Sequence, residues 1–133
     1  RGLPTMTEEK GITLAHSSPL NPGAWSYVLT MRAAHENFAA FTTNLCFIGH
    51  THVPIIVGED GTVNKYSAGA RHLINVGSVG QPRDGDSRAC YVLLTDDQVE
   101  FRRVPYPLEK TMEKIYAVPE LDPFLADRLR EGR

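Results

Sequence analysis

At residues 45–52 the sequence reads Leu45-Cys46-Phe47-Ile48-Gly49-His50-Thr51-His52. The four apolar residues predict a buried strand that ends at Gly49. His50 and His52 follow in a turn, two residues apart, so both imidazoles can be directed at one metal ion or at two neighbouring ions. The alternative is a pair of hydrogen-bonded histidines at a strand end. We favour ligation because Gly49 lets the backbone fold close to an ion.

His16 stands in a comparable position, directly after a second short strand at Ile12–Ala15. Alone, a histidine in such a turn is more often an ordinary surface residue. The ends of neighbouring strands meet at one edge of a sheet, however. We therefore expect His16, His50 and His52 to lie together.

A third segment follows the predicted strand His72–Val76 and reads Asn75-Val76-Gly77-Ser78-Val79-Gly80-Gln81-Pro82-Arg83. Backbone N–H groups in a glycine-rich strand exit, with an arginine beyond them, suit a phosphate or another oxyanion. A plain turn is the alternative.

The remaining sequence predicts helices and short strands. A helical pattern runs from about Ala24 to Thr42, with Asn21 and Pro22 at its start and with Thr30 as a possible cap of a second piece. The first ten residues are mostly polar and look like the tail of a preceding element. The other predicted elements are strands at Val53–Val57, Thr62–Lys65, Ala89–Thr95 and Gln98–Val104 and helices at Leu108–Tyr116 and Asp122–Arg130.

The composition argues against several kinds of partner. The 133 residues carry 14 Lys and Arg against 16 Asp and Glu, a net charge of −2, which does not favour binding to a nucleic-acid backbone or an anionic membrane. No apolar run is long enough to cross a bilayer. Cys46 and Cys90 form no Cys-x-x-Cys pair, and we expect two buried thiols in the cytoplasm. Because Arg1 stands where an initiator methionine would, we expect a longer protein.

Taken together, the three segments resemble the calcineurin-like metallophosphoesterase superfamily, and most closely its small bacterial and archaeal phosphodiesterases and phosphatases. The resemblance covers about Leu14 to Tyr106 and rests on Leu14–Pro19, Gly49–His52 and Asn75–Arg83. It implies an α/β fold, an α/β/β/α sandwich of two mixed sheets flanked by helices, with residues 1–133 as the C-terminal portion of one domain.

The resemblance also implies the roles of individual residues. His16 and His50 would ligate one divalent ion and His52 the other, and Mn, Fe, Zn or Ni would suit such a site. Gly77 and Ser78 would lie near the phosphate, and Arg83 would stabilise charge on the phosphoryl oxygens. The implied reaction is hydrolysis of phosphomonoesters or phosphodiesters at a dinuclear centre.

The sequence departs from the family in two ways. Ser17 stands where the family usually has glycine, and the three motifs of the family's first half (Asp-x-His, Gly-Asp-x-x-Asp, and Gly-Asn-His before an acid) are absent. Gly85-Asp86 does not replace the second, because Ala89 stands where the acid is required. A dinuclear centre needs carboxylates to hold the ions together. We expect them from a missing N-terminal half, in the same gene or a partner chain, and expect the isolated chain to associate.

Two alternatives are a non-catalytic scaffold with the same fold and a single-zinc site built on three histidines. The number of bound ions separates them: two favour the phosphoesterase, one the zinc site and none the scaffold. The other conspicuous residues receive structural interpretations: a surface position for His35, a structural role for His72, core packing for Trp25, Tyr27 and Phe38, and a solvated loop for Asp84 and Asp86.

Overall fold

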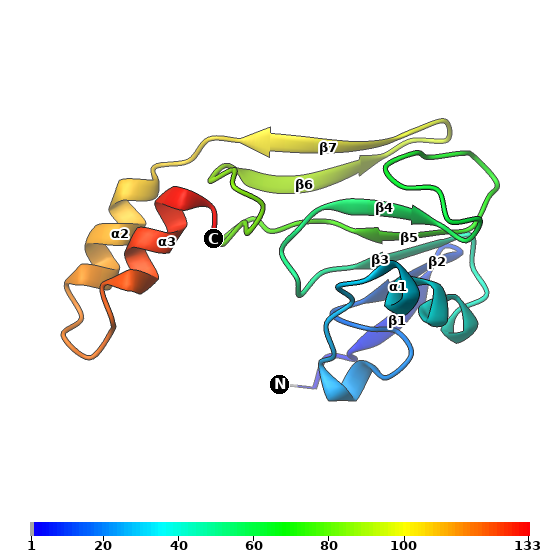
Figure 1. Cartoon of the computed structure of the whole chain (residues 1–133), viewed down its shortest axis with the longest axis horizontal. Helices are drawn as coiled ribbons and strands as arrows, with labels where there is room; N and C mark the ends of the chain where they lie inside the picture. Colours follow the sequence, from blue (N-terminus) through cyan, green and yellow to red (C-terminus); the bar gives the residue numbers. More distant parts are fainter. Residues whose placement is uncertain (1) are drawn as a thin grey trace.

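The structure, a computed structural model, describes residues 2–133 and contains a five-stranded sheet, a separate β-hairpin and helices (Figure 1). The strands of the larger sheet lie in the order β1-β2-β3-β5-β4. Their bounds are β1 Met6–Glu9, β2 Ile12–Ala15, β3 Leu45–Ile48, β4 Ile55–Gly58 and β5 His72–Asn75. β2, β3 and β5 run parallel, whereas β1 and β4 are antiparallel to their neighbours. This mixed sheet with its helices confirms the α/β class.

The first strand corrects an expectation. Arg1 lies outside the described residues, and the rest of the segment is not simply the tail of another element, because β1 pairs with β2 across a two-residue turn at Lys10 and Gly11. Both turn residues have positive φ, 51° and 74°, as the tightest hairpin turns require. β1 is polar because it lies at the edge of the sheet, where charged side chains remain in water.

The expected helix at 24–42 is wrong in its first part. The structure has a short 3₁₀ turn at Pro22–Ala24, a loop, helix α1 at Met31–Asn37 and a second 3₁₀ turn at Phe38–Ala40. Thr30 caps α1 as expected, since its hydroxyl accepts a hydrogen bond from the Ala33 amide at 3.1 Å. Residues 25–30 leave the helical path because Trp25 has a left-handed backbone, with φ 56°.

The other elements follow the sequence closely. β6 (Ala89–Leu94) and β7 (Val99–Val104) form the expected hairpin, and this antiparallel pair is the second sheet within residues 2–133. α2 (Leu108–Tyr116) and α3 (Phe124–Glu131) pack against each other. The segment 62–65 makes only one isolated bridge, from Val63 to Val57, rather than a strand.

Three apolar clusters hold these layers together. One lies between α1 and the large sheet and includes Phe38, Phe41, Cys46, Ile48 and Leu73. Another joins the opposite face of that sheet to the β6–β7 hairpin through Leu45, Ile56, Ile74, Val99 and Phe101. The third unites α2 and α3 around Leu108, Met112, Ala126 and Leu129. The order is therefore helix, sheet and second sheet, with the α2–α3 hairpin at one end (Figure 1).

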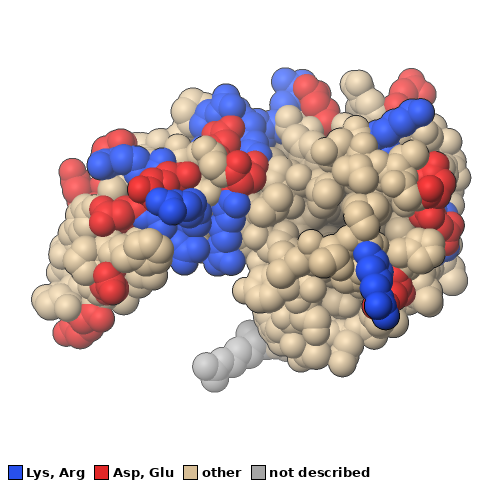
Figure 2. Space-filling model, viewed as in Figure 1, with Lys and Arg blue, Asp and Glu red and all other residues tan. Residues whose placement is uncertain are grey.

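The surface carries both signs of charge. In Figure 2, acidic and basic side chains alternate over the α2–α3 hairpin, while a large area over the sheets is uncharged. Within residues 2–133, no helix is both long and apolar enough to span a membrane.

Candidate functional site

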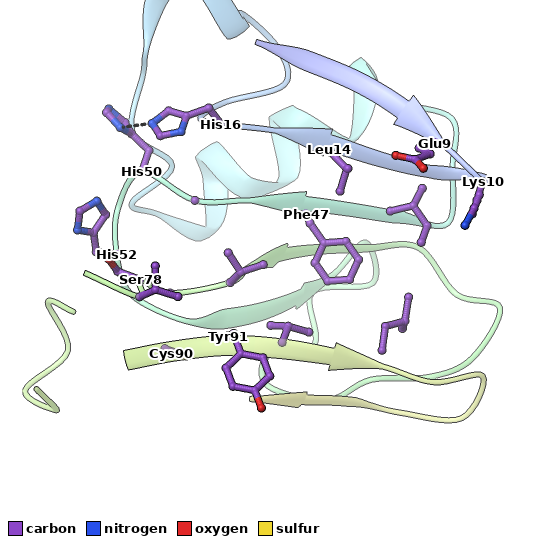
Figure 3. Close-up of a pocket in the computed structure, with 17 residues that line it drawn as sticks. Glu9, Lys10, Leu14, His16, Phe47, His50, His52, Ser78, Cys90 and Tyr91 are labelled. Carbon is purple, nitrogen blue, oxygen red and sulfur yellow. Dashed lines mark hydrogen bonds between the residues drawn. The ribbon is translucent and has the colours of Figure 1, made fainter. Parts of the chain in front are cut away.

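The parallel strands β2, β3 and β5 bring the three segments to one edge of the sheet. His16 follows β2, His50 and His52 follow β3, and Gly77 follows β5. All four residues line one cavity of about 700 Å³ between the large sheet and β6. Figure 3 shows the histidines at one end of the cavity, Glu9 and Lys10 at the other, and Leu14, Phe47 and Tyr91 along the apolar stretch between them.

His16 and His50 are in direct contact. The Nε2 atom of His16 and the Nδ1 atom of His50 are 3.1 Å apart, so one ring donates a hydrogen bond to the other (Figure 3). The backbone brings them together, because the Gly49 amide donates to the His16 carbonyl oxygen at 3.1 Å. Two imidazole nitrogens this close can turn toward one shared ion in place of their mutual hydrogen bond.

His52 is oriented by a backbone carbonyl. Its Nδ1 atom lies 2.7 Å from the Gln81 carbonyl oxygen, which fixes Nδ1 as the protonated nitrogen and leaves Nε2 with a free lone pair. A carbonyl behind a histidine is the usual support of a metal-ligating imidazole. Burial lowers the pKa of His52; the Gln81 bond opposes this shift, and the nearby Arg83 guanidinium adds to it.

The backbone at both histidines is unusual. His50 and His52 have φ values of 68° and 63°, in the left-handed region that residues with a Cβ rarely adopt. Such conformations cost about 1 kcal/mol or more each and gather at functional sites. The turn Gly49–His52 is therefore held in place by its surroundings.

Asn75 makes several of the hydrogen bonds that keep the turn Gly49–His52 in this conformation. Its side chain is 1% exposed, and Nδ2 donates to the Gly49 carbonyl oxygen at 2.7 Å and to the Thr51 hydroxyl at 2.8 Å. Its Oδ1 atom accepts a hydrogen bond from the Gly77 amide at 3.0 Å. One buried side chain thus joins the histidine turn to the glycine-rich loop.

The glycine-rich loop uses most of its own amides. The Gly80 and Gln81 amides donate to the Ser78 hydroxyl, and the Gly77 amide is bound to Asn75. These three N–H groups are therefore not free for an anion, contrary to the sequence expectation. Ser78 still has its hydroxyl hydrogen to donate, because it serves as acceptor in both bonds.

Gly77 is a glycine for two reasons. Its φ is 78°, and a Cβ atom there would lie 2.9 Å from both Cβ and Sγ of Cys90. The loop consequently passes closer to β6 than any other residue type would allow.

Arg83 lies beside His52 rather than in the cavity wall. Its amide donates to the His52 carbonyl oxygen at 3.2 Å, and its guanidinium donates to Oε1 of Gln81 at 2.8 Å. The Nε atom of Arg83 is buried and has no hydrogen-bond partner within residues 2–133. That orphaned donor leaves the guanidinium with unused capacity.

Trp25 and Tyr27 correct a further expectation. Phe38 is buried in the core as expected, but Trp25 and Tyr27 are 51% and 48% exposed. Their rings contact the histidine pair instead: Tyr27 stacks on His50, with ring centroids 4.1 Å apart. Helical spacing misplaced them because the chain between 25 and 30 is a loop.

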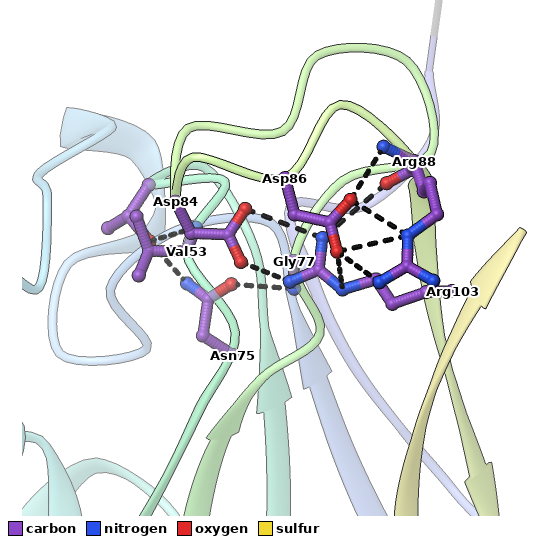
Figure 4. Close-up of polar contacts among 8 residues, drawn as sticks. Val53, Asn75, Gly77, Asp84, Asp86, Arg88 and Arg103 are labelled. Carbon is purple, nitrogen blue, oxygen red and sulfur yellow. Dashed lines mark hydrogen bonds and ion pairs between the residues drawn. The ribbon is translucent and has the colours of Figure 1, made fainter. Parts of the chain in front are cut away.

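Asp84 and Asp86 belong to the loop that follows the glycine-rich segment. They lie in a loop at the surface, as expected, and within it they form an ion-pair cluster in which Asp84 pairs with Arg103 and Asp86 with Arg88 (Figure 4). The Arg88 bonds lower the pKa of Asp86 to about 2. The cluster fixes the loop after Arg83 to the β6–β7 hairpin.

The remaining histidines match their expectations. His35 is exposed on α1, whereas His72 is 1% exposed with both ring nitrogens hydrogen-bonded.

Cys46 and Cys90 are free and buried, and burial raises the pKa of the Cys46 thiol to about 12. Ser17 is buried without a positive φ, so it replaces the family's glycine without left-handed strain.

Within residues 2–133, no three His, Cys, Asp or Glu side chains are grouped closely enough to enclose a metal ion. His16 and His50 form a pair, and His52 faces the same cavity from the other side of the turn (Figure 3). The nitrogens present suit divalent transition metals, but a complete ligand set needs further groups.

Comparison with known proteins identifies this arrangement. A crystal structure of a metallophosphoesterase from Sphaerobacter thermophilus superposes with a TM-score of 0.88 at 37% identity, covering 99% of this chain and 59% of that protein. The chain has the fold of the C-terminal half of a calcineurin-like metallophosphoesterase. The hypothetical protein PH1004 from Pyrococcus horikoshii shares the fold with a TM-score of 0.74 at 17% identity, covering all of this chain and 52% of that protein.

A curated relative of this chain is the uncharacterized protein MJ0912 of Methanocaldococcus jannaschii. The two are 33% identical over 143 residues, which cover 98% of this chain and 57% of the relative. No family model matches the sequence. The chain thus spans just over half the length of the proteins it resembles.

Proposed function

We propose that this chain is the histidine-bearing C-terminal portion of a metal-dependent phosphoesterase that hydrolyses phosphomonoesters or phosphodiesters. The observation that carries the proposal is the meeting of His16, His50 and His52 at the carboxyl ends of β2 and β3, around one cavity. The similarity to a metallophosphoesterase across nearly the whole chain supports it.

His16 and His50 would hold one ion and His52 a second. The 3.1 Å approach of the first two rings supports a shared ion, and the Gln81 carbonyl behind His52 leaves its Nε2 atom available. Mn, Fe, Zn and Ni all suit nitrogen ligands combined with carboxylates. When bound, two such ions would activate a water molecule and neutralise charge on the phosphoryl group.

The chain's own residues would orient the phosphate. Ser78 would donate its hydroxyl hydrogen to a phosphoryl oxygen from the cavity wall next to Gly77, as its remaining donor capacity supports. Arg83 would turn its guanidinium toward the developing charge and act as the catalytic arginine; its buried, unpartnered Nε supports this role.

The missing carboxylates would come from a segment outside residues 1–133, so that these residues form the C-terminal part of one domain. The apolar cavity wall supports this, because Leu14, Tyr91 and Leu94 are each more than a third exposed there. An apolar wall of this kind suits strands from the other half of the domain, in the same gene or a partner chain. Without that half, copies of the chain would associate through the same surface.

The two thiols bear on the compartment. Cys46 and Cys90 are buried and unpaired, as is usual for proteins of the reducing cytoplasm. We place the enzyme there.

The test compares the 133-residue chain with the complete protein. Elemental analysis and light scattering of the chain alone should find at most one ion per chain and associated species. The complete protein should bind two ions and hydrolyse p-nitrophenyl phosphate or its bis-ester with added Mn²⁺. A complete protein holding a single zinc ion without this activity would favour the zinc site, and one holding none would favour the scaffold.

A further inference from the structure

Two exposed aromatic side chains stand beside the histidine pair. Tyr27 lies flat on His50, with ring centroids 4.1 Å apart and an interplanar angle of 14°. The Trp25 ring centroid lies 4.8 Å from that of His16 and 5.9 Å from that of His50. Despite these contacts, about half of each aromatic side chain is open to solvent. Large apolar surface next to a polar site is a feature of ligand recognition.

The backbone conformation of Trp25 also favours a role in ligand recognition. Its φ of 56° is an outlier for a bulky residue, and it carries a free-energy cost of about 1 kcal/mol or more. Burial of the indole would repay that cost, but the side chain remains 51% exposed. The conformation instead places the ring against His16.

We propose that Trp25 and Tyr27 bind, by stacking, a planar aromatic group attached to the phosphate of the substrate. This inference rests on the proposed function, since the phosphate would lie at His16 and His50. Indole and phenol rings stack on any flat aromatic group, and this stacking does not depend on which polar atoms that group carries. The substrate class is therefore phosphate esters with an aromatic substituent, either a nucleotide or an aryl phosphate, in preference to alkyl phosphates.

Trp25 is the single tryptophan of this sequence, so its fluorescence reports directly on the site. The 133-residue chain, with Zn²⁺ present, is titrated with AMP, phenyl phosphate and glycerol 3-phosphate, with excitation of the indole alone. AMP, phenyl phosphate or both should change the emission with saturation, and glycerol 3-phosphate should not. A response to AMP alone identifies a nucleobase site, and one to phenyl phosphate alone a small aryl site. No response to either, or an equal response to glycerol 3-phosphate, would overturn the proposal.

Substitutions separate stacking from support of His50. Tyr27→Ala should weaken binding of the responding probe at least about fivefold, the lower range for a lost stacking partner, whereas Tyr27→Phe should preserve it. The matched control is Tyr116→Ala on α2, because Tyr116 is 47% exposed and belongs to a different layer. It should leave binding unchanged.

In the complete enzyme, Tyr27→Ala should lower kcat/KM for the aromatic ester about tenfold more than for glycerol 3-phosphate, mainly through KM. An equal loss for both esters would show that Tyr27 only supports His50. A complete enzyme that hydrolyses no phosphate ester would refute the proposed function, while the fluorescence titration would still decide whether the aromatic pair binds flat ligands.

Discussion

The two ends of β5 lie next to very different histidines. At its amino end His72 is buried, its Nδ1 atom lies 3.1 Å from the Ala70 carbonyl oxygen, and its Nε2 atom accepts from the Ser67 amide at 3.4 Å. At its carboxyl end Asn75 holds the turn of His50 and His52, whose backbones are strained. A histidine with both nitrogens satisfied contributes to the fold, whereas a strained one with a free nitrogen is available for chemistry.

Removing His50 or His52, which lie next to the carboxyl end of β5, should have the largest effect. In the complete enzyme, His50→Ala and His52→Ala should each lower metal-dependent hydrolysis of p-nitrophenyl phosphate by more than about 100-fold, since loss of an outer support alone costs 10–100-fold. His35→Ala, on the exposed face of α1, is the control and should retain wild-type rate and metal content. Near-normal turnover in either site variant would refute the ligand assignment.

The next change compares the two ends of β5 directly. Asn75→Ala and His72→Ala should each lower the free energy of unfolding by about 2–3 kcal/mol, because each leaves buried polar groups unpaired or a cavity. Only Asn75→Ala should also weaken metal binding, because the histidine turn loses two hydrogen bonds. Chemical denaturation and metal titration measure the two effects.

Asn75→Asp provides a second variant that keeps the acceptor for Gly77 but loses both donors. It should resemble Asn75→Ala in metal affinity. If His72→Ala weakened metal binding as much as the Asn75 variants do, the two ends of β5 would not differ in their contribution to the metal site.

Arg83 should affect turnover without affecting metal binding. Arg83→Ala should lower the rate about tenfold, within the range for a charged hydrogen bond, and Arg83→Lys should not restore it, because an ammonium group cannot donate two parallel bonds. Metal content, measured by elemental analysis, should stay the same. Loss of metal together with activity would assign Arg83 to the support of His52 instead.

The smallest effect concerns the close approach of the glycine-rich loop to β6. Gly77→Ala should lower stability by about 1–2 kcal/mol, since the new Cβ meets Cys90 at 2.9 Å and the φ of 78° disfavours it. Adding Cys90→Ala should recover only the part that is due to Sγ, because the Cβ of residue 90 stays 2.9 Å from the new Cβ and the backbone conformation stays unfavourable. Full recovery in the double variant, seen as an unchanged melting temperature, would exclude backbone strain.

Residue patterns predicted most of the fold, because the apolar runs at β3 and β5 and the alternation in β6 and β7 are direct consequences of burial. The helical spacing gave a wrong prediction where one backbone angle changed the direction of the chain. Trp25 has helical spacing with its neighbours, but its positive φ ends the 3₁₀ turn and turns two aromatic rings toward the histidines. An apolar pattern does not predict β1, because an edge strand needs no apolar face.

The site was predictable where it depends on strand order. The three segments meet because β2, β3 and β5 are parallel, which their apolar runs suggest. The role of Asn75 is not part of the sequence prediction, although an asparagine that ends a buried apolar strand must find hydrogen-bond partners. The sequence does not reveal whether the loop amides are free, because Ser78 and Asn75 accept their hydrogen bonds only in the folded loop.

The end of α3 touches the loop that follows Arg83. The Gly85 amide donates to the Gly132 carbonyl oxygen at 3.1 Å, and a side chain at Gly132 would clash with the backbone of Asp86 at 2.7 Å. The α2–α3 hairpin thus supports the loop that follows Arg83, although it contributes no residue to the cavity. Hydrogen exchange at the Gly85 amide would therefore follow the detachment of α3, a helix about forty residues further along the sequence. Lengthening the α2–α3 hairpin or replacing it with another would change the mobility of the loop after Arg83 before it changed any residue of the cavity.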